Sequence, residues 1–394
     1  MPITGIETLR NRVAIVGVGE SDIGKVPHMT GLGLNAQAAK RALDETGLKV
    51  SDIDGLLTAY SFTEPYFMLG TVLCEYLGLQ PRFNASVIVG GASPAVMLKH
   101  AAEAIATGQC ATVLVCAGEN RATGQTRDQA VAALAAVGHP YFERPYGASI
   151  PGCYAMIARS HMDQFGTTPE QLAAVAVTTR QHAVLHPNAH MRKPVTLADV
   201  QSSKPIADPL RMLDCCIISD AGGAFIVTSA ERAKDLRSKP AYLAGIGEFH
   251  THEHILCAPS LTEFGAKQSG MTAYRMAGLG PSDIDVAELY DCFTIVPILE
   301  LEELGFCPRG EGGRFYEEGH ASIGGKLPVN THGGMLSHAH AGAAGGLFGI
   351  VEAVRQLRGG LGPRQVQGAE VALVHNEGGI LSSHCTAVLT SQLR

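Results

Sequence analysis

Strand-like and helical patterns of apolar residues alternate along this chain, and the same order occurs twice. Residues 12–20 read RVAIVGVGE, a β-rich run that ends in glycines, and residues 34–46 have the apolar spacing of a helix. Much further along, residues 242–248 predict another strand and residues 266–277 another helix. The pattern therefore predicts an α/β protein.

The two copies share sequence as well as order. The run GLKVSDIDGLLTAYSFT corresponds to GLGPSDIDVAELYDCFT further along the chain. Gly17 matches Gly245 at an offset of 228 residues, and Asp52 matches Asp283 at an offset of 231 residues. Offsets that differ by only three residues indicate an internal duplication.

A middle segment does not repeat. We assign residues 1–120 and 214–238 to the first half, residues 239–394 to the second half, and residues 121–213 to an insertion. The insertion carries the proline- and glycine-interrupted run HPYFERPYGASIPG and two helical patterns. We expect it to form a loop domain over the active site that shapes substrate choice.

The composition narrows the class of protein. With 394 residues, 46% of them hydrophobic and 17% charged, the chain can bury a large core. A net charge of −7 argues against a nucleic-acid surface. No apolar stretch reaches the length of about 18 residues that a membrane span needs, and no signal-peptide pattern occurs, so we expect a cytoplasmic protein without membrane insertion. Its ten cysteines, none in a CxxC pair, are then expected to be reduced.

The densest concentration of candidate chemistry is VNTHGGMLSHAHAGAAGG at residues 329–346. It places His332, His338 and His340 among glycines that allow a ligand to approach the backbone closely. A helical run at residues 347–357 follows, and its N-terminus would favour negative charge beside the histidines. The histidines of FHTHEH, at residues 250–254, match no recognised metal motif, so we expect no metal.

Several motifs together carry a family resemblance. The stretches DIDVAELYDCFT, LPVNTHGG and EVALVHNEGG occur in the order found in the thiolase superfamily, and the chain most closely resembles its sterol-carrier-protein-type thiolases. The resemblance implies a duplicated thiolase fold, a five-layered α-β-α-β-α architecture with the inserted loop domain, and a homodimer.

The resemblance also locates a missing group. Thiolases use a cysteine at the N-terminal end of a buried helix as the acyl nucleophile. By the family spacing this position falls at Val89, which has no thiol, and Ser93 and Pro94 are interpreted as the N-cap and first residue of the helix. The nearest cysteines lie within apolar patterns typical of buried, inert thiols: Cys74, Cys110 and Cys116.

The other family positions are altered too. Tyr290 stands where many sterol-carrier-type thiolases have a histidine, and His340 keeps the histidine of the family's GHP motif without its neighbours. His375 aligns with the second thiolase cysteine, before a glycine pair, and His332 precedes another glycine pair. His340 also corresponds to Val89 at the helix entrance of the other half.

Without the thiolate, the covalent acyl intermediate of a thiolase cannot form. Aldol chemistry needs only an acid–base group and donors that stabilise an enolate, and steroid side-chain aldolases of this superfamily lack the cysteine and use tyrosines. The resemblance implies a β-hydroxyacyl-CoA aldolase, possibly acting on a steroid side chain, with a small zinc-ribbon/OB-fold partner protein. It assigns Tyr290 to proton transfer, His340 to the oxyanion hole or acid–base pair, and His375 or His332 to the complementary role.

Two alternatives stay open. A cysteine elsewhere could restore an acetyl-CoA acyltransferase, or the chain could be a non-catalytic acyl-CoA-binding subunit of a complex. In each case coenzyme A thioester is the ligand and the chain binds no cofactor of its own. Four basic residues are plausible contacts for the phosphates of coenzyme A, and no spacing singles one out: Arg121, Arg180, Arg192 and Lys193.

Overall fold

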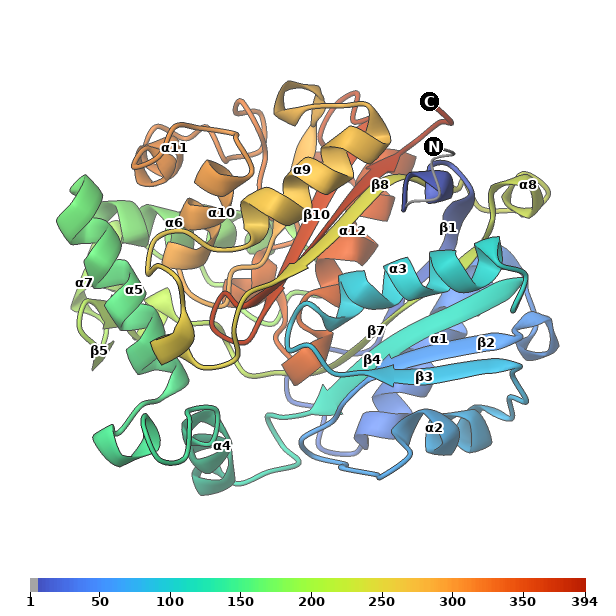
Figure 1. Cartoon of the computed structure of the whole chain (residues 1–394), viewed down its shortest axis with the longest axis horizontal. Helices are drawn as coiled ribbons and strands as arrows, with labels where there is room; N and C mark the ends of the chain where they lie inside the picture. The colour runs from blue at the N-terminus through green and yellow to red at the C-terminus, as the bar shows by residue number, and fades with distance from the viewer. Residues whose placement is uncertain (1–5) are drawn as a thin grey trace.

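The computed structural model describes residues 6–394; residues 1–5, where the predicted first half begins, lie outside the described residues. Two α/β halves pack together, and the insertion lies at one end of the molecule (Figure 1). The strands of the first half are β1 (Val13–Glu20), β2 (Gly55–Ala59), β3 (Phe83–Val87), β4 (Thr112–Asn120) and β7 (Asp220–Ser229). Those of the second half are β8 (Ala241–His250), β9 (Val286–Leu289), β10 (Val371–Gly378) and β11 (Ser383–Thr390).

Each half has the same strand order, which confirms the duplication. Antiparallel pairing of β1 with β8 joins the two halves. Outward from this junction, the first half runs β1-β7-β4-β2-β3 and the second runs β8-β11-β10-β9. In the first half β3 pairs in parallel with β2; in the second, Val329 forms an isolated parallel bridge with Ala287 of β9. Val329 thus marks the place of a fifth strand.

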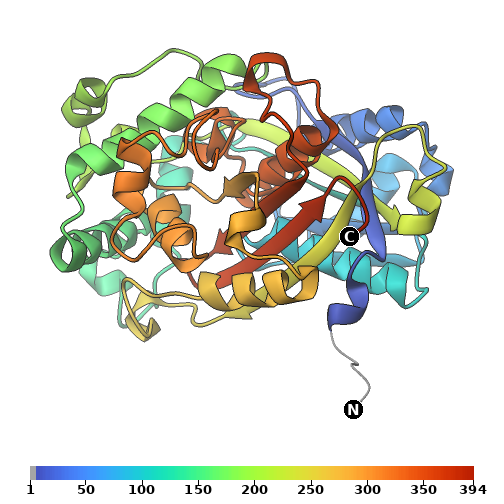
Figure 2. The same ribbon diagram turned by 90° about the horizontal axis from the view of Figure 1, so that it is seen from above.

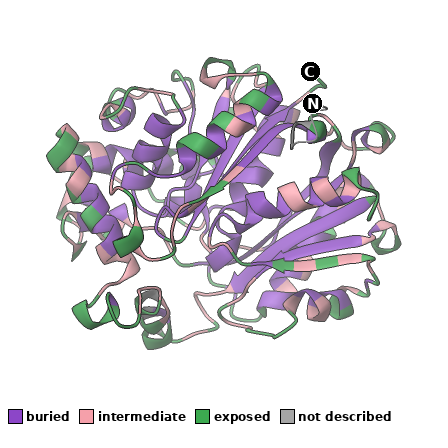
Figure 3. Ribbon diagram, in the orientation of Figure 1, coloured by how far each residue is buried: buried purple, intermediate pink, exposed green. Residues whose placement is uncertain are grey.

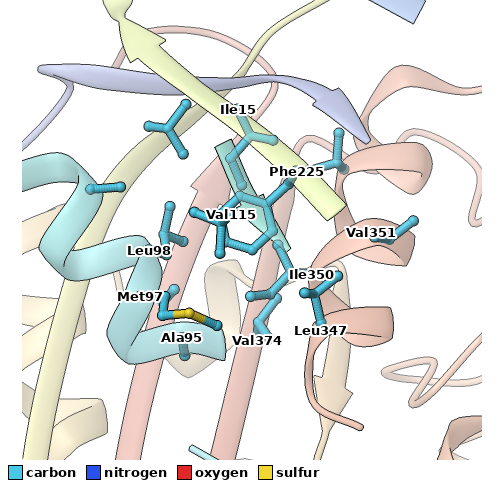
Figure 4. Close-up of a cluster of buried hydrophobic side chains, with 14 of the residues drawn as sticks. Ile15, Ala95, Met97, Leu98, Val115, Phe225, Leu347, Ile350, Val351 and Val374 are labelled. Atoms are coloured by element: carbon cyan, nitrogen blue, oxygen red, sulfur yellow. The ribbon is translucent and has the colours of Figure 1, made fainter. Parts of the chain in front are cut away.

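Two helices fill the space between the halves, α3 (Ser93–Ala106) and α12 (Leu347–Arg358). Successive strand residues point to opposite faces, so Ile15 of β1 belongs to this central cluster while its neighbours Ala14 and Val16 belong to an outer one. Figure 4 shows Met97 of α3 and Leu347 of α12 among the buried side chains of the central cluster. The central layer is therefore helical, with strands on either side.

Further helices cover the outer face of each half. In the first half these are α1 (Gly31–Thr46) and α2 (Leu69–Leu77), and in the second they are α9 (Ala266–Ala277) and α10 (Ile295–Glu303). Figure 2 shows the second-half helices and strands from above, and in Figure 3 the strands are almost entirely buried except at the β3 edge. The predicted α-β-α-β-α layering is confirmed.

The insertion packs against the second half. It contains the helices α4 (Arg127–Ala135), α5 (Ile150–Phe165), α6 (Pro169–Leu185) and α7 (Leu197–Ser202). Tyr154 of α5 stacks on Phe293 with ring centroids 4.5 Å apart, within the same apolar cluster as α10. Figure 1 shows α5 and α6 beside α10 and α11 (Gly312–Glu317), with α4 at the lower edge. The boundaries at residues 121–213 remain a prediction.

The two central helices are entered by corresponding loops. One loop follows β3 and leads into α3, and the other follows Val329 and leads into α12. The first contains Val89 and the second contains His340, so the predicted correspondence of these positions agrees with the topology. Among the described residues, no helix combines the length and apolar character that crossing a membrane would require.

Candidate active site

The loop that leads into α3 offers backbone where a nucleophile was expected. Val89 is partly buried against the central cluster. The Ser93 hydroxyl accepts a hydrogen bond from the Val89 N–H at 3.1 Å and donates one to the Gly90 carbonyl at 2.7 Å. Ser93 is itself the first helical residue and caps no helical N–H, so its interpretation as the N-cap is wrong: Ala92 holds that position. Ser93 instead fixes the shape of the Val89 loop.

Tyr290 lies directly on this loop. A Cβ atom added at Gly91 would be 2.0 Å from Tyr290 Oη, so only glycine lets the phenol approach this closely. Tyr290 is 5% exposed, and within the described part of the chain its hydroxyl has no hydrogen-bond partner. Burial, with Cys292 and Glu377 nearby, raises the pKa of Tyr290 well above its usual value. The site therefore presents a neutral phenol with free hydrogen-bonding capacity.

His340 lies beside Tyr290, and both belong to the second half. Their ring centroids are 6.4 Å apart and the rings are nearly perpendicular. Asp291 holds the turn that precedes His340, since its Oδ1 accepts the Met335 N–H at 2.6 Å. The residue next to Tyr290 in sequence thus also positions the histidine loop.

The His340 imidazole is neutral near pH 7. Burial, with a smaller effect of the Arg121 charge, lowers the pKa of His340 to about 3. Its Nδ1 lies 3.0 Å from Cys216 Sγ, in the segment just before β7. A neutral imidazole offers one N–H donor and one acceptor, which suits stabilisation of an enolate oxygen or relay of a proton.

Two ionisable side chains at the end of β4, Glu119 and Arg121, lie beside the loop that carries His340. Arg121, after β4, packs over the Phe62 ring at 4.7 Å. Glu119 is buried and accepts the Phe62 N–H, and burial raises the pKa of its carboxyl. A Cβ at Gly342 would be 2.2 Å from Glu119 Oε2, so the loop that carries His340 packs directly against Glu119. Arg121 thus lies near enough to His340 for its charge to help lower the pKa of that histidine.

His375 does not lie with Tyr290 and His340. Its Nδ1 lies 2.8 Å from Thr386 Oγ1 and its Nε2 lies 3.2 Å from His384 Nδ1. The next residue, Asn376, faces the opposite side of β10 and donates to the Gly346 carbonyl at 3.3 Å, just before α12. A one-residue difference in a strand changes the face, so the structure places Asn376 at the helix entrance.

The His332 side chain is hydrogen-bonded to a buried carboxylate, away from Tyr290. Its Nδ1 lies 2.8 Å from Glu288 Oε2, deep in the interior. Burial alone would lower the pKa of His332, but the Glu288 carboxylate raises it above its ordinary value. The same carboxyl group accepts from Thr331, whose hydroxyl also contacts Glu352. This network is buried and lies apart from the Val89 loop.

One cluster has the residue types of a metal site. Candidate ligand atoms of Glu20, His186 and His338 lie within 4.8 Å of one another. Glu20 is already paired, with His338 Nε2 and Arg355 Nη1 each 3.0 Å away. Nδ1 of His186 accepts the Asn188 N–H at 3.1 Å, which leaves Nε2 protonated in the neutral ring and unable to ligate. The geometry favours a hydrogen-bonded junction of the two halves and the insertion.

The structure separates the basic candidates for phosphate contact. Arg180 is buried; it donates to Ser337 Oγ at 2.7 Å and to the Lys193 carbonyl at 2.9 Å, so it holds the insertion against the histidine loop. Arg192 and Lys193 are exposed. Together with Arg121 they remain the candidates for coenzyme A phosphates.

Sequence reasoning missed Cys216 and Asn376. The adjacent pair Cys215 and Cys216 was an available signal, because only one of two neighbouring strand-like residues can face a given site. Asn376 could have been found by counting the alternation of β10 from its buried apolar residues.

Several known proteins are similar to this chain in sequence and in fold. The family model described as "Thiolase C-terminal domain-like" matches residues 247–391. The 17-hydroxy-3-oxo-4-pregnene-20-carboxyl-CoA lyase of Mycobacterium tuberculosis is 36% identical, over 95% of this chain and 98% of that protein. The acetyl-CoA acetyltransferase of Methanothermobacter thermautotrophicus is 34% identical, over 93% and 96%. The solved structure of the "Ltp2-ChsH2(DUF35) aldolase" is similar with a TM-score of 0.86 and 34% identity, over 97% of this chain and 98% of that one.

Proposed function

The chain belongs to the thiolase superfamily, and from this premise we propose that it is a carbon–carbon lyase that cleaves a β-hydroxyacyl-CoA by a retro-aldol reaction. The relative from Mycobacterium tuberculosis is named for a CoA ester with a hydroxyl group on the carbon β to its thioester, which is the substrate class that the proposal requires. A steroid side chain is the proposed acyl group.

The observation that carries the proposal is the Val89 loop. At the nucleophile position the chain has an aliphatic side chain, and the free hydroxyl of Tyr290 lies against the adjacent Gly91. An acyl-enzyme cannot form on valine, whereas a phenol at this place can transfer a proton. The substitution therefore favours aldol over acyl-transfer chemistry.

We assign the proton steps to Tyr290. In one concerted exchange the phenol oxygen takes the proton of the substrate Cβ hydroxyl while the phenol passes its own proton to Cα. The Cα–Cβ bonding pair moves toward the thioester as an enolate and ends in the new Cα–H bond, and Cβ leaves as a ketone. Because Tyr290 gains one proton as it gives up another, no tyrosinate accumulates, which suits a phenol whose pKa is raised.

His340 is proposed to stabilise the enolate. A donor aimed at the oxygen where negative charge develops lowers the barrier of the cleavage step. A neutral imidazole whose pKa is lowered to about 3 is a poor base, so donation is the role that its environment supports. Neither His375 nor His332 is needed in this scheme.

The acyltransferase is the second candidate, because one relative is named an acetyl-CoA acetyltransferase. It requires a thiolate in the site. Burial raises the pKa of the Cys216 and Cys292 thiols, so both stay protonated near neutral pH. Incubation with acetyl-CoA or acetoacetyl-CoA followed by intact-mass measurement separates the candidates, since a stable acyl adduct requires the acyltransferase.

Partners form part of the proposal. The similar aldolase structure is named for ChsH2(DUF35) together with Ltp2, and we propose a small zinc-ribbon/OB-fold partner for this chain as well. We also propose that the chain forms a homodimer and that it is cytoplasmic. The ten unpaired cysteines are in keeping with that location. If the chain were only a binding subunit, it would bind acyl-CoA without turnover under every condition.

The test compares two substrates. The chain, alone and with its partner, is incubated with a 17-hydroxy steroid 20-carboxyl-CoA and, separately, with a β-ketoacyl-CoA plus free coenzyme A. We expect ketone and shortened acyl-CoA from the first and no thiolysis of the second. Thiolysis of the second with the first untouched would establish the acyltransferase instead.

A further inference from the structure

Cys216 is held rigidly against His340. The Cys216 N–H donates to the Cys292 carbonyl at 2.9 Å, and the Ile217 N–H donates to the Met335 carbonyl at 3.2 Å. Two residues further on, the Ser219 N–H donates to the carbonyl of His340 itself at 3.0 Å. This segment therefore follows the histidine loop along its length, and the 3.0 Å contact of Cys216 Sγ with His340 Nδ1 is built into the backbone geometry.

The neighbouring thiol serves as an internal comparison. Cys215 Sγ donates to the Arg211 carbonyl at 3.2 Å, away from the histidine. Only one of the two adjacent cysteines thus faces the candidate active site.

A thiol beside an imidazole can have two roles. As a nucleophile it would pass its proton to the ring and form a thiolate–imidazolium pair. Burial opposes both charges here, since it raises the pKa of the Cys216 thiol and lowers that of His340 to about 3, and Arg121 further disfavours the imidazolium. The pair is therefore a neutral hydrogen bond.

The direction of that hydrogen bond follows from the two groups. An imidazole nitrogen is a much better acceptor than a thiol sulfur, so the S–H donates to Nδ1. Nδ1 then carries the lone pair and Nε2 carries the proton. Nε2 has no hydrogen-bond partner within the described residues, and a Cβ at Gly345, next to the α12 entrance, would lie 3.3 Å from it.

We propose that Cys216 is a positioning residue that fixes His340 as the Nε2–H tautomer, so that His340 presents a donor to the enolate oxygen of the substrate. The inference rests on the proposed function and sharpens it: of the two roles that the sequence leaves open for His340, it selects the oxyanion donor. It also gives the partly buried Cys216 thiol a role other than that of a nucleophile.

The tautomer is measured first, in the resting enzyme without substrate. The chain labelled with ¹⁵N-histidine gives long-range ¹H–¹⁵N spectra in which the resonances lost in His340→Gln belong to His340. We expect an unprotonated Nδ1 and a protonated Nε2 at pH 7. A protonated Nδ1 would overturn the proposal whether or not the chain proves to be an aldolase, so its failure and that of the proposed function are distinguishable.

Substitutions then test the role in turnover. Cys216→Ala removes the donor and is expected to lower kcat about tenfold with little change in KM. Cys216→Ser keeps an O–H donor and should restore most of the rate, while Cys215→Ala serves as the matched control. A Cys216→Ala enzyme as active as the control, or an acyl group found on Cys216 by mass spectrometry, would contradict the positioning role.

Discussion

In the proposed mechanism, Tyr290 takes over the part that a cysteine plays in a thiolase. Val89 stands at the expected position of that cysteine, and the Tyr290 hydroxyl lies against the same loop at Gly91. Burial raises the pKa of the phenol, so we propose that it exchanges protons with the substrate and does not act as a free base. His340 is the proposed neutral donor beside it.

The first prediction concerns the phenol. Tyr290→Phe removes only the hydroxyl, and we expect kcat for β-hydroxyacyl-CoA cleavage to fall by roughly 10² to 10⁴, the usual contribution of general acid–base catalysis. Tyr274→Phe is the matched control, because that partly buried hydroxyl donates to the Leu304 carbonyl on the outer face of the second half. Unchanged cleavage by Tyr290→Phe, with normal folding by circular dichroism, would remove Tyr290 from the mechanism.

The second prediction concerns the glycine beneath the phenol. In Gly91→Ala the new methyl group would meet Tyr290 Oη at 2.0 Å and the Glu377 carbonyl at 2.5 Å, so the loop or the phenol must shift. We expect a loss of about 1–3 kcal/mol in the free energy of unfolding and a large loss of turnover. Gly33→Ala in α1, where the nearest atom is 3.5 Å away, should be neutral or slightly stabilising. Denaturant titration and kinetics of both variants give the comparison.

At the scale of elements, local patterns predicted much of what the structure shows. The helix expected at residues 266–277 is α9 with the same limits, and the run at 347–357 is α12 with one further residue. Such elements are predictable because apolar spacing and flanking glycines are local properties. The face of β10 was not predicted: His375 contacts Thr386 and His384, whereas Asn376, one residue further on, faces the α12 entrance.

The turn that carries His340 gives the third prediction. Burial raises the pKa of Asp291 to about 6, although Met335 and Leu336 N–H groups bond its carboxyl. A raised folded-state pKa means that Asp291 stabilises the fold when protonated, and this contribution is lost as pH rises through about 6. Asp291→Asn cannot ionise, so the unfolding free energy of the wild type relative to this variant should fall by about 2 kcal/mol from pH 4 to pH 6. A difference that stays constant with pH would contradict the raised pKa.

At the scale of the whole molecule, the duplication could be predicted from sequence and the way its parts join could not. Matching offsets revealed two halves, but the pairing of β1 with β8 and the central α3–α12 layer depend on contacts between residues far apart in the chain. The same is true of the junction where Glu20 of the first half, His186 of the insertion and His338 of the second half meet. No local spacing brings those three together.

The fourth prediction tests that junction. Glu20 pairs with Arg355 at 3.0 Å, and although burial opposes its charge, Arg355 and His338 hold its pKa well below the usual range. Glu20→Gln leaves a largely buried guanidinium without its carboxylate and should cost about 3–5 kcal/mol of stability. Asp44→Asn, at the exposed pair with Lys40, should cost less than about 1 kcal/mol.

The same junction is expected to hold no metal. Addition of Zn²⁺, or of a chelator, should leave the Tm of the wild type unchanged, because ligands that bind only the folded state raise Tm. A reproducible increase of Tm with stoichiometric Zn²⁺, absent in His338→Ala, would show that Glu20, His186 and His338 form a metal site after all.

The central claim is that the enzyme breaks a Cα–Cβ bond through an enolate without an acyl-enzyme. The most direct measurement is cleavage of a 17-hydroxy steroid 20-carboxyl-CoA in D₂O, followed by mass analysis of both products and of the protein. Retro-aldol cleavage predicts a steroid ketone, a shortened acyl-CoA with one deuterium at Cα, and a protein that carries no acyl group. Acyl-CoA without deuterium, or a protein heavier by an acyl group, would contradict the claim.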